Sequence, residues 1–138
     1  MYGALDISTS GLIAQRTRLD AISANIANSR AILDSQGNLN PYRRREVFFA
    51  PGDPSASTAA GRELGVHVAS IGIDQDAVRM EYEPGSMFAD AQGRVPYPDI
   101  DPVTEQINAM EAMRAYDANI TVAEATKSMM AQALRLIG

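Results

Sequence analysis

Apolar residues recur at helical spacing near both ends of the chain. Near the N-terminus five of them repeat every seven positions: Leu5, Leu12, Leu19, Ile26 and Leu33. Ile22 occupies the second position of this repeat, which Gln15 and Ser29 fill elsewhere. A seam this narrow predicts a helix that makes a coiled-coil contact instead of covering a broad core.

The start of this helix is harder to place from the pattern. Four residues are candidate N-caps: Asp6, Ser8, Thr9 and Ser10. Gly11 weakens any helix that runs through it. We therefore expect the helix to be secure from about residue 12 to 29.

The C-terminal segment has a longer pattern. Asp101 is the expected N-cap and Pro102 the first helical residue, and no glycine or proline follows until Gly138. The expected apolar stripe contains Val103, Ile107, Met110, Met113, Tyr116, Ile120, Ala123, Met130, Leu134 and Ile137. Three consecutive steps of three residues end at Tyr116, which predicts that the stripe shifts around the helix there. A helix of this length reaches roughly 50 Å, too long to hide its apolar face on a small domain.

Short strands and turns are expected between the two helices. "YRRREVFF" reads as a strand or an extended arm, and "LGVHVASIGI" alternates with a change of phase that suggests a bulge. "AVRMEYEPG" alternates cleanly, and the "DQD" before it predicts a hairpin with the preceding strand. The fold class is α+β, mainly α, with long terminal helices and a small β insertion. Its expected parts are an N-terminal helix (1–33), a β-rich outer region (34–101) and a C-terminal helix (102–138).

Composition narrows the classes of function. The chain has 138 residues, 46% of them apolar, and a net charge of -5; the charge is +1 over 1–30, -5 over 31–101 and -1 over 102–138. The acidity argues against duplex nucleic acid as the main partner. There is no cysteine for a disulfide or thiolate metal site. No apolar run is long enough to span a membrane, and the first residues lack the pattern of a cleavable signal peptide.

Candidate chemical sites are few. His67 is the only histidine, and on an expected strand without a convergent partner it is best interpreted as a solvent-facing residue. Asp74 with Asp76, and Asp99 with Asp101, form D-x-D pairs that a hard cation can use, but neither matches a calcium-binding loop. Phosphate loops, nucleophile elbows and HExxH motifs are absent from the sequence. We therefore expect no enzyme activity, catalytic residue, cofactor, metal or small-molecule substrate.

The one basic cluster allows two interpretations. Arg43, Arg44 and Arg45 form either a solvated face or a docking point for an acidic neighbour, such as the acidic 74–101 stretch of another copy. The sequence leaves both open.

Several stretches, in order along nearly the whole chain, resemble the axial proteins of the bacterial flagellum. "SGL" with "ANIAN" is shared by rod, hook and hook-associated proteins. "PYRR", "YPDIDPV" and "RAYDANITVAEATKSM" in so short a chain resemble the C-type proximal rod proteins in particular. The chain departs from that pattern at Ala24-Asn25, where Asn-Asn is usual, and at Asp101, where Asn is usual. "PSASTAAGRE" matches poorly and is interpreted as a variable loop.

The resemblance implies a structural subunit of the proximal rod, built helically into the drive shaft of the basal body. The partners implied are further copies, other rod proteins and the flagellar type III export apparatus, with no membrane insertion; the location implied is the rod crossing the periplasm. Asn25 and Asn28 are then expected to hydrogen-bond where helices of neighbouring subunits and the following loop meet. The expected interface residues are Leu12, Leu19, Ile22, Asn25, Ile26, Asn28, Arg43, Arg44, Ile107, Met110, Met113, Tyr116, Asn119, Ile120, Met130 and Leu134.

Three other interpretations are compatible with parts of the pattern. One is another axial protein of the B type, against which "YPDIDPV" argues. A second is a soluble helical adaptor or chaperone, which would be a stable monomer or dimer. The third is a metal-dependent enzyme using Asp74, Asp76 and His67.

Overall fold

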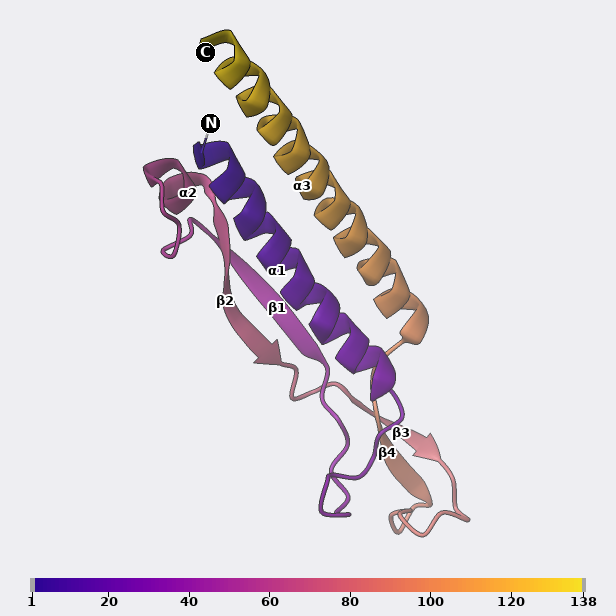
Figure 1. Ribbon diagram of the computed structural model, residues 1–138. Helices are drawn as coiled ribbons and strands as arrows, with labels where there is room; N and C mark the ends of the chain where they lie inside the picture. The colour runs from indigo at the N-terminus through magenta and orange to yellow at the C-terminus, as the bar shows by residue number, and fades with distance from the viewer. Residues whose placement is uncertain (1, 138) are drawn as a thin grey trace.

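Two long helices lie side by side and are joined through two small antiparallel sheets (Figure 1). The computed structural model describes residues 2–137. Its elements are α1 (Tyr2–Ala27), β1 (Arg45–Pro51), α2 (Ala59–Leu64), β2 (Val66–Ile73), β3 (Val78–Tyr82), β4 (Arg94–Pro98) and α3 (Pro102–Ile137). The expected class, α+β and mainly α, is confirmed. The outermost bounds expected for the two helical parts, Met1 and Gly138, lie outside the described residues.

Helix α1 begins at Tyr2, earlier than the sequence pattern indicates, and it continues through Gly11 without a break. The candidate caps are helix-interior residues, so that expectation was wrong. Two of them hold the segment around α2 instead: the Asp6 carboxylate accepts the Thr58 N–H at 2.9 Å, and the Ser10 hydroxyl accepts the Val66 N–H at 3.0 Å. Tertiary contacts thus compensate the weak local helix signal.

The C-terminal end of α1 also differs from the prediction. The helix ends at Ala27, and Leu33 lies beyond it in an isolated bridge with Leu39. Leu33 therefore does not extend the heptad seam, and the first helical part is shorter than 1–33. The chain then turns at residues 28–30, where the Ser29 N–H donates to the Ile26 carbonyl at 3.2 Å.

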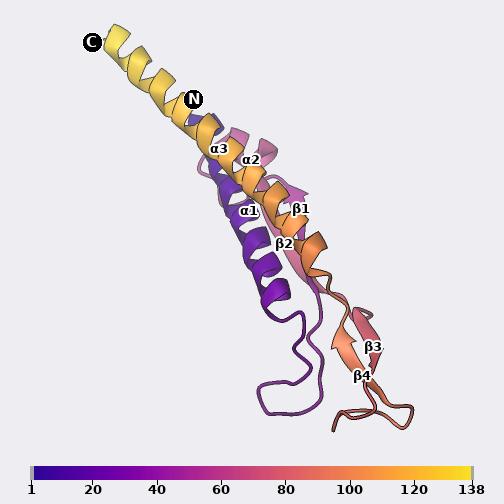
Figure 2. The ribbon, with the colours of Figure 1, turned by 90° about the vertical axis from the view of Figure 1, so that its right-hand side faces the viewer.

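Helix α3 starts as predicted. The Asp101 carboxylate accepts the N–H groups of Val103 and Thr104, both at 3.2 Å, and the Thr104 hydroxyl at 2.6 Å. These bonds, that of Thr104 first, lower the pKa of Asp101 below its ordinary value. In two views the last turns of α3 extend past the start of α1 (Figures 1 and 2).

The strands pair differently from the expected hairpin. β2 pairs with β1, and β3 pairs with β4, each antiparallel. The hairpin between residues 66–73 and 78–82 was therefore wrong, although both strands exist. The partner of β2 is β1, which begins within the "YRRREVFF" stretch and pairs with β2 from Arg45 to Pro51. The bulge is confirmed: Phe48 pairs with Ser70 and Phe49 with Val68, which leaves Ala69 as the extra residue.

The two helices meet through small residues. Ala112 of α3 is fully buried, and a Cβ atom added at Gly11 of α1 would come within 2.8 Å of the Asn119 amide nitrogen. Ala14 and Thr126 are buried as well. Small side chains at these positions allow the two backbones to approach closely.

We expect Ala112→Leu to reduce the free energy of unfolding by about 1–3 kcal/mol, because the added atoms overpack the contact between α1 and α3. The matched control is Ala118→Leu, at an exposed position of the same helix, where a change within about 0.5 kcal/mol is expected. Chemical denaturation of both variants measures the difference. Equal effects would contradict the packing described here.

Candidate assembly interface

The first half of the predicted α3 stripe faces away from the rest of the molecule. Val103, Ile107, Met110 and Met113 are each more than half exposed. The side of α3 that packs on the chain carries Glu105 and Ala112 instead. Ile107 and Ala112 are five residues apart, which places them about 140° apart around the helix. An apolar surface is therefore left bare along the first turns of α3.

The second half of the stripe lies on the α1 side. Tyr116, Ile120, Ala123 and Met130 are all half-buried. The change from exposed to half-buried occurs between Met113 and Tyr116, at the run of three-residue steps. The predicted shift of the stripe around the helix is thus confirmed. Leu134, near the end of α3, is 69% exposed again, and the last turns of α3 extend past the start of α1 (Figure 1). The side chain of Ile137 lies outside the described part of the chain.

A further apolar row escaped the sequence analysis. Val122, Met129 and Leu136 are exposed and recur every seven residues on α3. At about 100° per residue they lie roughly 80–120° around α3 from Ala112, on a flank between the packed side and the outer face. Their strict heptad spacing was the signal that could have revealed them.

The expected interface residues of α1 are less exposed. Leu12, Leu19 and Ile26 are half-buried, and Ile22 is buried. Ile13 and Tyr2 are the exposed large apolar residues of this helix. The α1 seam is therefore partly covered by the chain itself, whereas the outer side of α3 is not.

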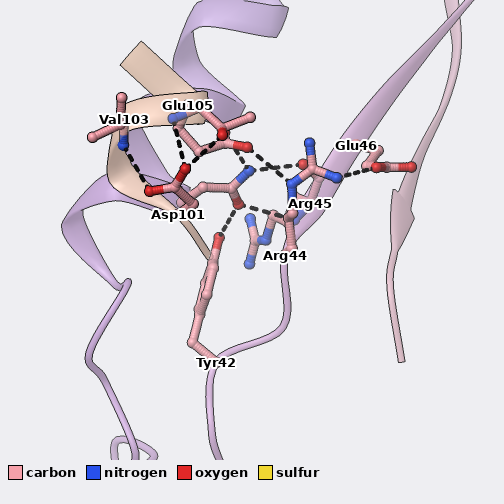
Figure 3. A network of polar contacts seen from close by, with 9 residues as sticks. Tyr42, Arg44, Arg45, Glu46, Asp101, Val103 and Glu105 are labelled. Carbon is pink, nitrogen blue, oxygen red and sulfur yellow. Dashed lines mark hydrogen bonds and ion pairs between the residues drawn. The ribbon is translucent and has the colours of Figure 1, made fainter. Parts of the chain in front are cut away.

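Below the start of α3, a buried polar junction joins α1, β1 and α3 (Figure 3). Its centre is Asn25, which is 1% exposed. The Asn25 amide donates to the Arg45 carbonyl at 2.9 Å and to the Glu105 carboxylate at 3.1 Å. Its oxygen accepts the Arg45 N–H at 2.9 Å and the Tyr42 hydroxyl at 3.3 Å. Asn25 thus pairs with both backbone groups of Arg45, as a neighbouring strand would.

The charged half of the junction is formed by Glu105 and Arg44. Glu105 is 2% exposed, and its second oxygen accepts the Arg44 Nε–H at 2.9 Å. Arg44 also pairs with Glu46. Partial burial would lower the pKa of Arg44, but its bonds to Glu105 and the charges of both glutamates raise it above the ordinary value. The buried carboxylate of Glu105 is therefore fully compensated within the chain.

The remaining expected interface residues also have partners within the chain. The side-chain amides of Asn28 and Asn119 bond back to Ala24 and Ala115, four residues earlier in each helix, at 2.8 and 2.9 Å. Arg43 bonds the Pro41 carbonyl at 3.2 Å. Asn25 and Arg44 were expected between subunits, but the chain's own groups use all of the bonding capacity of Asn25. The structure thus assigns Asn25 to the fold, with the following loop as one of its partners.

The candidate chemical residues form no reaction centre. His67 is half-buried with Nδ1 2.6 Å from the Gly52 carbonyl oxygen, so its expected solvent-facing placement was wrong. Both D-x-D pairs border one hollow together with Arg44 and Glu105. Over residues 2–137 no group of three or more histidine, aspartate or glutamate side chains is arranged to hold a metal. None of the described helices has both the length and the apolar character that crossing a bilayer requires.

Comparison with known proteins identifies relatives over the whole chain. The family model described as "Flagella basal body rod protein" matches residues 5–29, and "Flagellar basal body rod FlgEFG protein C-terminal" matches residues 91–136. "Flagellar basal-body rod protein FlgC" of Salmonella typhimurium is 41% identical, over 99% of this chain and 97% of its own. The proteins of that name from Agrobacterium fabrum and Bacillus subtilis are 37% and 33% identical, over 99% and 98% of this chain and 95% and 97% of theirs.

We expect Asn25→Ala to reduce the free energy of unfolding by about 3 kcal/mol, because it leaves buried partners on β1 and α3 without a hydrogen bond. Asn28→Ala is the matched control, since the Asn28 amide bonds only within α1 and should change stability by less than about 1 kcal/mol. Urea denaturation of both variants measures this. A small effect of Asn25→Ala would mean that the junction does not hold the three elements together.

Proposed function

Because the chain belongs to the FlgC family of flagellar basal-body rod proteins, we propose that it assembles helically into the proximal rod and transmits motor torque along it. It is a structural subunit of the rod and not an enzyme. The observation that carries the proposal is the bare apolar face of α3, formed by Val103, Ile107, Met110 and Met113. Such a face is costly in water on a lone chain and is stabilising once neighbouring helices cover it.

In this proposal the paired helices α1 and α3 form the inner layer of a tube, and residues 28–101 form its outer part. Burying each large apolar residue on a neighbour contributes roughly 1.5–3 kcal/mol. Val122, Met129 and Leu136 add a second exposed apolar row on a flank of the later turns of α3, which is 36 residues long. Contacts spread over such a length oppose sliding and twisting of one subunit against the next.

The polar junction gives the subunit internal stiffness in this role. It connects α1, β1 and α3 at one place (Figure 3). A load applied to the outer part would then reach both helices through hydrogen bonds and an ion pair. A flexible linker would dissipate the same load.

The proposed partners are further copies and other rod proteins, which meet the subunit after delivery by the flagellar type III export apparatus. The proposed location is the rod where it crosses the periplasm. We further propose that the expected interface residues on the helix surfaces, from Leu12 to Leu134, take part in these contacts. Asn25 then acts indirectly, by holding those surfaces in place.

The test of this role is deletion of the gene and complementation. We expect cells without it to lack flagella and motility, and the wild-type chain to restore both. Ile107→Glu combined with Met110→Glu should fail to restore motility, because two charges would be placed where a neighbouring helix packs. The readouts are swimming and the presence of the chain in purified basal bodies.

The matched control places two glutamates at exposed polar positions of the same helix, Thr121→Glu with Ser128→Glu. This variant should restore at least part of the motility. Thermal unfolding of both purified variants checks that each is folded. Full motility with the Ile107 and Met110 variant would remove the α3 face from the proposal, and motile deletion cells would remove the function itself.

Hydrogen exchange on the dilute chain tests whether α3 needs neighbours. Thr126 is the last buried residue of α3 among those described, and the last turns of this helix extend past the start of α1 (Figure 1). We expect amides after about residue 127 to exchange at least tenfold faster than those of 105–126, because local opening there breaks few buried contacts. Uniform protection along α3 would show that the isolated chain already stabilises this end.

A further inference from the structure

An open groove lies at the lower end of α1. Its volume is about 420 Å³, and its lining includes Asn28, Tyr42, Arg43, Arg45 and Ile73. We call this site the arginine groove. It is separate from the outer face of α3, none of whose residues line it.

The arginine groove carries cationic groups with no acidic partner in the described chain. Arg43 bonds only the Pro41 carbonyl, and Arg45 lies 5.7 Å from the centre of the Tyr42 ring. By contrast, Arg44 between them is fully engaged with Glu46 and Glu105. The one carboxylate in the lining, Asp34, is occupied by the N–H groups of its own turn.

A second hollow carries the opposite charge. Asp74, Asp76, Asp99 and Asp101 border it, and we call these residues the acidic cluster. Among residues 2–137 the carboxylates of Asp76 and Asp99 make neither a hydrogen bond nor an ion pair. Asp101 caps α3, and Asp74 accepts the Asp76 N–H at 3.0 Å.

The two charged sites are built on one segment. Ile73 and Gln75 line the arginine groove, whereas Asp74 and Asp76 border the acidic cluster. Along residues 73–76, successive residues therefore line the arginine groove and the acidic cluster in alternation. Each subunit presents both charges a short distance apart but on different surfaces.

We propose that the arginine groove of one copy receives the acidic cluster of the next copy. This inference rests on the proposed assembly into a rod and names one of its contacts. Because two different surfaces meet, the contact is heterologous, and repetition of it generates a ring or a helix instead of a closed dimer. The charges set direction and register, while the outer face of α3 supplies the apolar contact.

Charge reversal with rescue tests the pairing. Arg43→Glu with Arg45→Glu, and separately Asp76→Arg with Asp99→Arg, should each lower the amount of the chain in purified basal bodies at least tenfold. The variant carrying all four changes restores opposite charges across the contact, and it should recover at least half of the wild-type amount. Circular dichroism and thermal unfolding of the purified full-length chains check that all three variants are folded.

The outcomes separate this inference from the proposed function. Absence of the wild-type chain from basal bodies overturns the function itself. Wild-type incorporation by both double variants overturns the charged contact and leaves the function standing. Loss in both double variants without recovery in the fourfold variant overturns the second copy as the occupant. Loss followed by recovery is the result that supports the pairing.

Discussion

The buried amide of Asn25 holds α1, β1 and α3 together through four hydrogen bonds. One side chain satisfies both backbone groups of Arg45, the hydroxyl of Tyr42 and the carboxylate of Glu105. These partners come from the loop before β1, from β1 itself and from α3. Because the group is buried, each bond replaces one that water would otherwise make, and the loss of any element leaves the others unsatisfied.

This polar centre accompanies an unusual distribution of apolar residues. The core residues of the described chain, which are buried and hydrophobic, are small or of medium size: Ala14, Ile22, Ala77, Val95, Ile100 and Ala112. Many of the larger ones, including Ile107, Met110 and Leu134, are more than half exposed. Close helix packing and hydrogen bonds thus hold the subunit together, and much of its large apolar surface is left exposed. In the proposed rod, neighbouring subunits would cover this exposed surface.

Two kinds of surface then have separate tasks in the proposed assembly. The apolar face of α3 contributes affinity but does not select one orientation of the neighbour, because the hydrophobic effect is non-directional. The arginine groove and the acidic cluster contribute direction, because opposite charges favour one register and like charges oppose the others. Arg44 and Glu105 belong to the buried junction and also line the hollow of the acidic cluster, so the junction connects the start of α3 to the charged surfaces. It therefore fixes how the two surfaces are oriented relative to each other.

Features that depend on local spacing could be predicted from the order of the residues. The two long helices, the Asp101 cap, the bulge in β2 and the shift of the α3 stripe near Met113 all follow from patterns a few residues long. The family resemblance was also carried by short motifs in order. Heptad spacing also relates Val122, Met129 and Leu136, a row that was not predicted from the sequence.

Tertiary structure alone decided the features that join distant residues. Strand pairing is one of them. β2 pairs with β1 and not with β3, and this could not be predicted because alternation within a strand gives no information about its partner. The early start of α1 was another, because Asp6 and Ser10 bond to residues more than 50 positions away. The role of Asn25 was the third, since its four partners converge only after α1, β1 and α3 have packed. Helix periodicity defines a face, but which face is covered depends on what folds against it.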